Sequence, residues 1–155
     1  NVMDKPIDTI VCLDGCEVIG AFLASELSRS GVLSTNAHKT IYVVTPEFNS
    51  NGQMIFRDNL KPEIYGKNVL LLLASATTGK TVRNSIECIE YYGGILQGIS
   101  AIFSAVDSIN GRRIDALFRA DDIPNYEAFA HSDCPMCKEG KPVEALVNGY
   151  GYSEI

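Results

Sequence analysis

The chain has 155 residues, of which 46% are hydrophobic and 21% are charged, and it carries a formal net charge of -6 at pH 7. This composition is too apolar for an intrinsically disordered chain and fits one compact domain with a buried core. The negative charge argues against a nucleic-acid partner, because a polyanion needs a basic surface. The longest apolar run, residues 69–74, is far too short to cross a membrane. We therefore expect a cytoplasmic protein with neither nucleic-acid nor membrane partners.

The ends of the chain and its cysteines add three expectations. The chain starts with Asn1 and reaches an apolar run almost at once, so we expect an N-terminal segment to be lacking. We assign residues 1–155 to a single domain, with residues 131–155 as a C-terminal tail. The five cysteines are an odd number and several lie in apolar runs, so a disulfide framework is not expected.

The first strand and helix are predicted from residue 8 onward. The run "DTIVCL" (8–13) is short, apolar and rich in β-branched residues, and Asp14-Gly15 ends it with a turn signal. From residue 16 to residue 30 the apolar residues recur at helical spacing, and Gly31 supplies a stop. A buried strand followed by an amphipathic helix is therefore expected.

A second buried strand and a hairpin are predicted next. The run "KTIYVVT" (39–45) is apolar and β-branched, and Pro46 ends it. The polar stretch "EFNSNGQ" (47–53) predicts a turn or loop, and "QMIFR" (53–57) is a candidate hairpin arm beside it.

The second half of the chain continues the alternation. A third buried strand starts at residue 69, and a helix follows with Val82, Ile86 and Ile89 on one face. Two further strands are predicted, at residues 95–106 and 113–120. Alternating strands and helices imply right-handed crossovers and a mostly parallel sheet flanked by helices, which is an α/β fold. Ligands of such folds bind beyond the carboxyl ends of the strands.

The turn after the third strand is the main candidate site. The stretch "VLLLLASATTGKT" (69–81) is an apolar run that ends in three threonines, a glycine and a lysine at a helix start, where backbone N–H groups attract anions. Its letters fit two templates: a nucleoside-triphosphate P-loop with Ala74 in place of the first glycine, or a cradle for one terminal phosphate. An ordinary turn with N-capping hydroxyls is the third interpretation. The candidate phosphate-binding residues are Ser75, Ala76, Thr77, Thr78, Gly79, Lys80 and Thr81.

A second turn supports the single-phosphate interpretation. A triphosphate site needs a carboxylate at the end of another strand for Mg²⁺, and Asp107 is the candidate. However, the first strand also ends in a small turn that leads into a helix, "CLDGCEVIG" (12–20), so two anion-sized turns flank the same edge of the sheet. Two turns suggest two separated phosphate groups.

These stretches resemble one family. The segment "VLLLLASATTGKTVRNSIECIEYYGG" is similar to the loop of type I phosphoribosyltransferases that binds 5-phosphoribosyl-1-diphosphate, and "IVCLDGCEVIGAFLASELS" is similar to their pyrophosphate loop. The segment "CPMCKEGKPVEAL" resembles a C-terminal segment of orotate phosphoribosyltransferase-like members. The resemblance covers most of the chain from Asp8 onward.

The resemblance implies roles for individual residues. The turn of residues 77–81 would enclose the 5-phosphate. Asp14, Gly15 and Cys16 would lie near the pyrophosphate, mainly through backbone groups. Arg57 and Lys61 would be the catalytic cations of a mobile flap that closes over the pyrophosphate. The resemblance also implies Mg²⁺ bound with the phosphoribosyl diphosphate, and a homodimer.

The sequence departs from the family at one important point. Leu73 and Ala74 stand where the family has two adjacent carboxylates, which engage the ribose hydroxyls and stabilise the charge on the sugar as pyrophosphate leaves. Asp14 or Asp107 could supply a compensating carboxylate. We therefore predict a phosphoribosyltransferase-like protein, of the glycosyltransferase class, that binds phosphoribosyl diphosphate or a nucleotide and has weak transfer activity toward orotate or a related base. The alternatives are a non-enzymatic nucleotide or phosphoribosyl diphosphate sensor, and a P-loop NTPase.

The C-terminal "HSDCPMC" motif is a separate candidate. His131, Cys134 and Cys137 have a spacing that could contribute to a zinc site, but a structural zinc site needs four ligands. We expect a reduced turn that anchors the tail, and no metal site.

Overall fold

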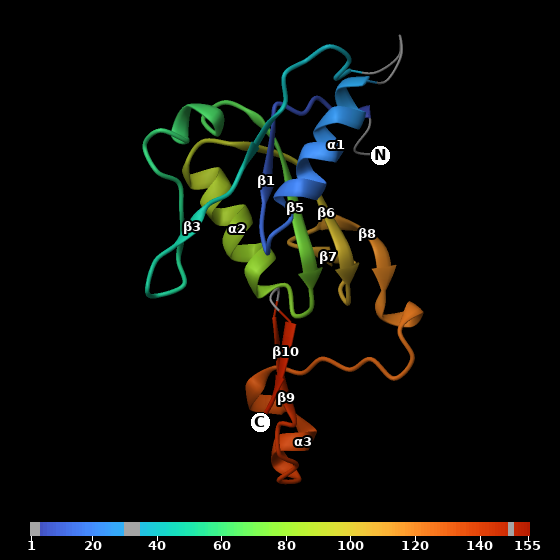
Figure 1. Ribbon diagram of the computed structural model, residues 1–155. Coiled ribbons are helices and arrows are strands. Elements are labelled where there is room, and N and C mark those ends of the chain that lie inside the picture. The colour runs from blue at the N-terminus through green and yellow to red at the C-terminus, as the bar shows by residue number, and fades with distance from the viewer. Residues whose placement is uncertain (1–3, 30–34, 149–150) are drawn as a thin grey trace.

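A six-stranded sheet forms the centre of the molecule. The computed structural model describes residues 4–29, 35–148 and 151–155. The strand order in the sheet is β2-β1-β5-β6-β8-β7, and all neighbouring strands are parallel except β7 and β8 (Figure 1). The bounds are β1 Thr9–Cys12, β2 Tyr42–Val44, β5 Asn68–Ala76, β6 Ile95–Ser104, β7 Ser108–Ile109 and β8 Arg112–Arg119.

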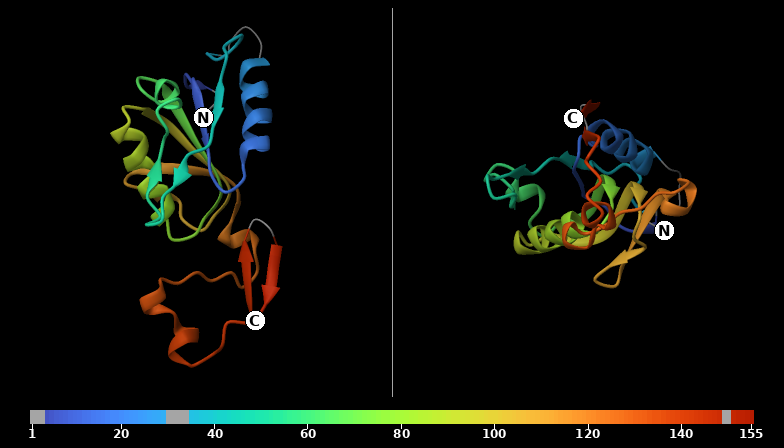
Figure 2. Two further views of the ribbon diagram at one scale, coloured as in Figure 1. Left: turned by 60° about the vertical axis from the view of Figure 1, so that its left-hand side comes forward. Right: turned by 90° about the horizontal axis from the view of Figure 1, so that it is seen from below.

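Two longer helices cover the sheet, one on each face. They are α1, Glu17–Arg29, and α2, Lys80–Tyr91. Figure 2 shows them on opposite sides of the strands. The predicted α/β fold, with a mostly parallel sheet between helices, is confirmed.

Strand β5 explains why the sheet needs a helix on both faces. Its side chains alternate, so that Leu70 and Leu72 join the core beneath α1, whereas Leu71 and Leu73 join the core beneath α2. All four leucines are at most 3% exposed. Full burial of one leucine side chain stabilises the fold by about 1.5 to 3 kcal/mol, so covering both faces of this strand is a large part of the folding energy.

Helix α2 follows directly from its sequence pattern. Val82, Ile86 and Ile89 recur at helical spacing and are buried against the sheet. The helix ends at Tyr91, Gly93 follows with a left-handed φ of 78°, and the N–H of Gly94 donates a hydrogen bond to the carbonyl oxygen of Ile89.

The smaller elements lie in the connections. The predicted hairpin arm pairs as β4 with β3, so the first two residues of the predicted loop 47–53 form a strand. The bounds are β3 Glu47–Phe48, β4 Met54–Ile55, η2 Lys61–Glu63, η3 Ala120–Asp122, η4 His131–Asp133, α3 Pro135–Lys138, β9 Ala145–Asn148 and β10 Gly151–Glu154.

The antiparallel edge strand β7 was not predicted. It pairs with β8 through a two-residue turn, Asn110-Gly111, whose φ angles are 50° and 73°. Asn-Gly is the sequence preferred for such a turn, because both residues tolerate positive φ. The signal was present in the sequence, but β7 has only two residues, too few for a hydrophobic pattern.

The C-terminal tail contains an antiparallel hairpin, β9–β10. Figures 1 and 2 show that this part of the chain extends away from the sheet, beyond the carboxyl ends of the parallel strands. Leu146, Val147 and Tyr152 are exposed on the hairpin. No helix in the described ranges is long and apolar enough to span a membrane.

Asp8 joins the start of β1 to the start of β5. Its Oδ2 accepts hydrogen bonds from the backbone N–H of Asn68, at 2.9 Å, and from the Asn68 side chain, at 2.6 Å. Burial acts to raise the pKa of Asp8, but the two hydrogen bonds from Asn68, together with Lys39 and Lys67, outweigh it and the pKa is lowered. Folding therefore favours the ionised carboxylate.

We predict that Asp8→Asn lowers the free energy of unfolding at neutral pH by about 1 to 2 kcal/mol, because a charge-assisted contact becomes neutral. The lowered pKa means that the contribution of Asp8 is complete above the ordinary value of 3.8 and is lost as the pH falls through the lowered value. Urea denaturation of both proteins at neutral pH and well below pH 3.8 measures the difference, which should shrink in acid.

Asp58→Asn is the matched control. Asp58 also forms a charged contact, with Lys61, but this ion pair is exposed to solvent. This variant should alter stability much less. An Asp8→Asn effect of equal size at both pH values would contradict the prediction.

Candidate functional site

The candidate phosphate-binding turn, residues 75–81, lies where β5 ends and α2 begins. We call it the phosphate turn. Gly79 precedes the helix with a left-handed φ of 74°, and a Cβ atom there would clash with Cδ1 of Ile109. Glycine is therefore required both by the backbone conformation and by the close packing of β7 beneath the turn. The side chains of Thr77 and Thr78 are exposed.

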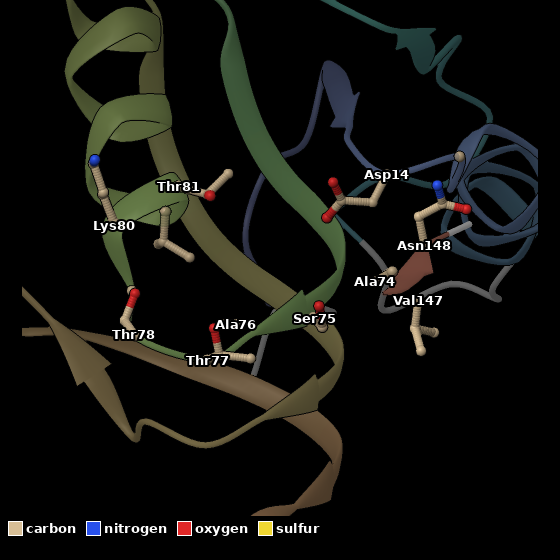
Figure 3. Close-up of a pocket in the computed structure, with 13 residues that line it drawn as sticks. Asp14, Ala74, Ser75, Ala76, Thr77, Thr78, Lys80, Thr81, Val147 and Asn148 are labelled. Carbon is tan, nitrogen blue, oxygen red and sulfur yellow. The ribbon is translucent and has the colours of Figure 1, made fainter. Parts of the chain in front are cut away.

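The start of α2 favours an anion. The first backbone N–H groups of a helix have no partner within the helix, and they carry the positive end of its dipole. No acidic residue occupies the first turn of α2. Among the described residues Lys80 has no carboxylate partner, although Figure 3 shows that its side chain extends along the helix, away from Asp14.

The turn forms one wall of a cavity of about 840 Å³. This volume is within the range of small-molecule sites. The cavity joins the ends of β1 and β5, the start of α2 and the end of β9 (Figure 3). Its lining residues are Asp14, Gly15, Ala74, Ser75, Ala76, Thr77, Thr78, Gly79, Lys80, Thr81, Val82, Val147 and Asn148.

Asp14 contributes a carboxylate to this cavity. It has a φ of 55°, and Gly15 follows with a φ of 78°, so the β1 turn has two consecutive left-handed residues. Burial raises the pKa of Asp14, and a hydrogen bond from the backbone N–H of Ala74 partly offsets this rise. The hydrogen bond links the β1 turn to the end of β5.

Leu73 and Ala74 differ in their surroundings. Leu73 is fully buried in the core beneath α2, whereas Ala74 is partly exposed and lines the cavity. An acidic side chain at position 73 would be placed among leucines and isoleucines, where an ionised group is strongly disfavoured. Of these two positions, only position 74 offers a side chain to the cavity.

The structure does not bring all the predicted site residues together. The cavity lining includes Asp14, Gly15 and the whole of residues 75–81, but not Cys16, Arg57 or Lys61. The Cys16 side chain is 2% exposed and packs in the core beneath α1.

The flap cations and Asp107 are engaged elsewhere. Arg57 forms an ion pair with Glu47 across the β3–β4 hairpin, and Lys61 pairs with Asp58. Asp107, the candidate carboxylate for a triphosphate site, pairs with Arg119 and does not line the cavity. Of the two carboxylates considered as compensation, Asp14 is the one that the fold places at the cavity.

Sequence reasoning missed Val147 and Asn148. They end β9 and reach the cavity because the tail returns to the carboxyl edge of the sheet. No local motif marks them, and the glycine-rich aromatic tail only suggested that this segment docks on the domain or on a partner.

The C-terminal cysteines form a hydrogen-bonded pair. The backbone N–H and then the thiol of Cys137 lower the pKa of Cys134, and the contact with Cys134 raises the pKa of Cys137. The side chain of His131 lies outside the described part of the structure. Among the described side chains no group of three His, Cys, Asp or Glu residues could hold a metal ion.

Solved structures with the same fold are phosphoribosyltransferases. The hypoxanthine phosphoribosyltransferase of Trypanosoma cruzi has a TM-score of 0.54, with 15% identity over 77% of this chain and 63% of that chain. The adenine phosphoribosyltransferase of Thermoanaerobacter pseudethanolicus has a TM-score of 0.52, with 18% identity over 74% of this chain and 71% of that one. This chain therefore has the α/β fold of the type I phosphoribosyltransferases.

The relatives found by sequence indicate a narrower group within this fold than the solved structures do. Orotate phosphoribosyltransferase of Thermus thermophilus is 36% identical over 104 residues, which cover 64% of this chain and 53% of the relative. That of Pelotomaculum thermopropionicum is 34% identical over 97 residues, covering 59% and 47%. No family model matches the chain. The predicted resemblance to the type I phosphoribosyltransferase family, and to its orotate enzymes, is confirmed, and the chain spans about half the length of the curated relatives it matches.

We predict that Gly79→Ala destabilises the protein by about 2 to 4 kcal/mol. The left-handed φ costs about 1 kcal/mol for a residue with a Cβ atom, and overpacking against buried Ile109 adds about 1 to 3 kcal/mol. Urea denaturation measures the change.

Gly111→Ala is the matched control, since Gly111 has nearly the same φ, 73°, but no neighbouring atom lies within 4 Å of the place that a Cβ atom would take. It should cost only about 1 kcal/mol, the conformational part. Adding Ile109→Ala should lower the free energy of unfolding less in the Gly79→Ala variant than in the Gly111→Ala variant, because it also removes the clash with the added Cβ atom. Equal losses for the two glycine variants would show that packing beneath the turn is unimportant.

Proposed function

We propose that this chain is an orotate phosphoribosyltransferase-like protein that binds phosphoribosyl diphosphate or a nucleotide at the cavity between β1 and β5. The observation that carries the proposal is the threonine-rich turn of residues 75–81, which ends the central strand, begins α2 and faces that cavity. The similarity to orotate phosphoribosyltransferases supports the substrate class.

The phosphate turn has the donors that a phosphate monoester needs. The hydroxyl groups of Thr77, Thr78 and Thr81 can donate hydrogen bonds to phosphate oxygens, and the N–H groups at the start of α2 add further donors. Lys80 supplies positive charge nearby. In this proposal the 5-phosphate lies in the turn.

The diphosphate would lie nearer to the β1 turn. The N–H groups of Asp14 and Gly15 are the proposed contacts, because two consecutive left-handed residues present backbone groups in a tight turn. The N–H of Cys16 instead donates a hydrogen bond to the carbonyl oxygen of Leu13. Mg²⁺ typically binds through substrate phosphates and one or two carboxylates. The cavity fits this arrangement, since a diphosphate brings its own oxygen ligands and Asp14 lies at the wall. When bound, the metal would neutralise charge on the leaving pyrophosphate.

We propose that transfer of phosphoribose to orotate or a related base is weak. Leu73 and Ala74 offer no carboxylate to the ribose, and Arg57 and Lys61 are paired with acidic neighbours away from the cavity. A non-enzymatic sensor of the same ligands is the alternative. A P-loop NTPase is less well supported, because Asp107 pairs with Arg119 outside the cavity.

The remaining proposals concern the setting of the protein. A cytoplasmic homodimer is proposed from the family resemblance and from the exposed apolar side chains of the tail, including Leu146, Val147 and Tyr152. Light scattering at micromolar concentration tests the dimer.

We predict that Thr78→Ala weakens phosphate binding roughly fivefold, the loss expected for one hydrogen bond of about 1 kcal/mol. Isothermal titration calorimetry with phosphoribosyl diphosphate, a nucleoside monophosphate and ATP measures the affinities. The exposed Thr40, which is far from the cavity lining, gives the control variant Thr40→Ala. Tighter binding of ATP with Mg²⁺ than of the other two ligands would reject the proposed site in favour of a P-loop.

We also predict that pyrophosphate release with orotate is slow and that Ala74→Asp increases it. Position 74 faces the cavity, so an added carboxylate there can reach a bound sugar. Leu73→Glu should instead destabilise the fold by about 3 kcal/mol or more, because the charge would enter the core. A coupled pyrophosphate assay on the full-length protein tests both, and rapid turnover of orotate by the unmodified protein would refute weak activity.

A further inference from the structure

Asp14 gives the cavity two ends of opposite character. One end is the phosphate turn, with its hydroxyl and N–H donors. At the other end lies the carboxylate of Asp14, the one acidic side chain among the described residues that line the cavity. In Figure 3 this carboxylate points from the end of β1 toward β5.

The carboxylate is held in position but retains acceptor capacity. The backbone N–H of Ala74 donates one hydrogen bond to it, and a carboxylate has about four acceptor positions. The residue is exposed to solvent, so water occupies the remaining positions, although neighbouring protein atoms partly desolvate the carboxylate and raise the pKa of Asp14. A ligand that donates hydrogen bonds would replace that water.

The charge of Asp14 selects the kind of ligand group. Without a metal ion, a phosphate placed directly against the carboxylate would meet like charge, so the 5-phosphate belongs in the turn of residues 77–81 and not beside Asp14. Hydroxyl groups are neutral, and a carboxylate accepts strong hydrogen bonds from them. Ala74, which lies beside Asp14 on the cavity wall, presents only a methyl group.

We propose that Asp14 binds the sugar hydroxyl groups of a pentose 5-phosphate whose phosphate lies in the turn of residues 77–81. The proposal rests on the proposed function and deepens it, because it names the residue that recognises the sugar. Asp14 thereby supplies, from the end of β1, a carboxylate that Leu73 and Ala74 do not supply from β5. It is a specificity-determining residue, and the ligands it selects carry free vicinal hydroxyl groups.

The test compares three ligands by calorimetry without divalent metal: inorganic phosphate, uridine 5′-monophosphate and its 2′,3′-dideoxy analogue. The wild-type protein should bind the monophosphate roughly tenfold to a hundredfold more tightly than the dideoxy analogue, the range for hydrogen bonds to a charged group. Asp14→Asn should reduce this ratio to a few-fold while leaving the affinity for inorganic phosphate unchanged. Asparagine retains an oxygen that can accept the Ala74 hydrogen bond, and intact phosphate binding shows that the variant is folded.

Two control variants distinguish sugar recognition by Asp14 from phosphate binding in the turn. Thr78→Ala should weaken the binding of all three ligands and leave the ratio of the affinities for the two nucleotides unchanged. Asp107→Asn removes a carboxylate outside the cavity and should change neither quantity.

The contradicting outcomes are distinct. Equal wild-type affinity for the two nucleotides, or a ratio that persists in Asp14→Asn, overturns the role of Asp14 while the phosphate site stands. Failure of the wild-type protein to bind any of the three ligands overturns the proposed function together with this inference.

Discussion

Burial of strand β5 on both faces is the constraint on which the rest of the structure depends. Its leucines alternate between the core beneath α1 and the core beneath α2. Each helix must therefore cross from the end of one strand back over the sheet, which places the β1 turn and the β5 turn at the same edge. The cavity forms between these turns because the strands that precede them are direct neighbours.

Because side chains alternate along β5, adjacent residues 73 and 74 have different roles: one packs in the core and the other faces the cavity. At position 73 the side chain belongs to the core, and the chain has a leucine that adds to packing. At position 74 the side chain faces the cavity, and the chain has an alanine that offers no polar group. The phosphate turn depends on neither side chain, because its donors are threonine hydroxyls and backbone N–H groups. A chain can therefore keep the phosphate turn while lacking acids on β5.

Packing beneath the turn explains why its shape is retained. Ile109, from the short edge strand β7, fills the space directly under Gly79. That strand is held against β8 by the Asn110-Gly111 turn. An edge hairpin distant from β5 in sequence thus supports the backbone that would contact a phosphate. On the opposite side, Val147 and Asn148 bring the tail to the same cavity, so the tail contributes to its walls.

The sequence by itself determined the α/β fold, the main strands and helices, and the threonine-rich turn where the second long helix begins, because these depend on local periodicity and on glycine and threonine at fixed spacing. The resemblance carried by the same segments indicated the family. Only the tertiary structure decided which candidates meet. Asp14 reaches the cavity, whereas Cys16, two residues further on, turns into the core as α1 begins, and Arg57 and Lys61 pair with nearby acids. It also decided that Leu73 and Ala74 face opposite sides of the sheet, and that the tail returns to the site. These outcomes depend on side-chain direction and on contacts between segments distant in sequence, which no local pattern encodes.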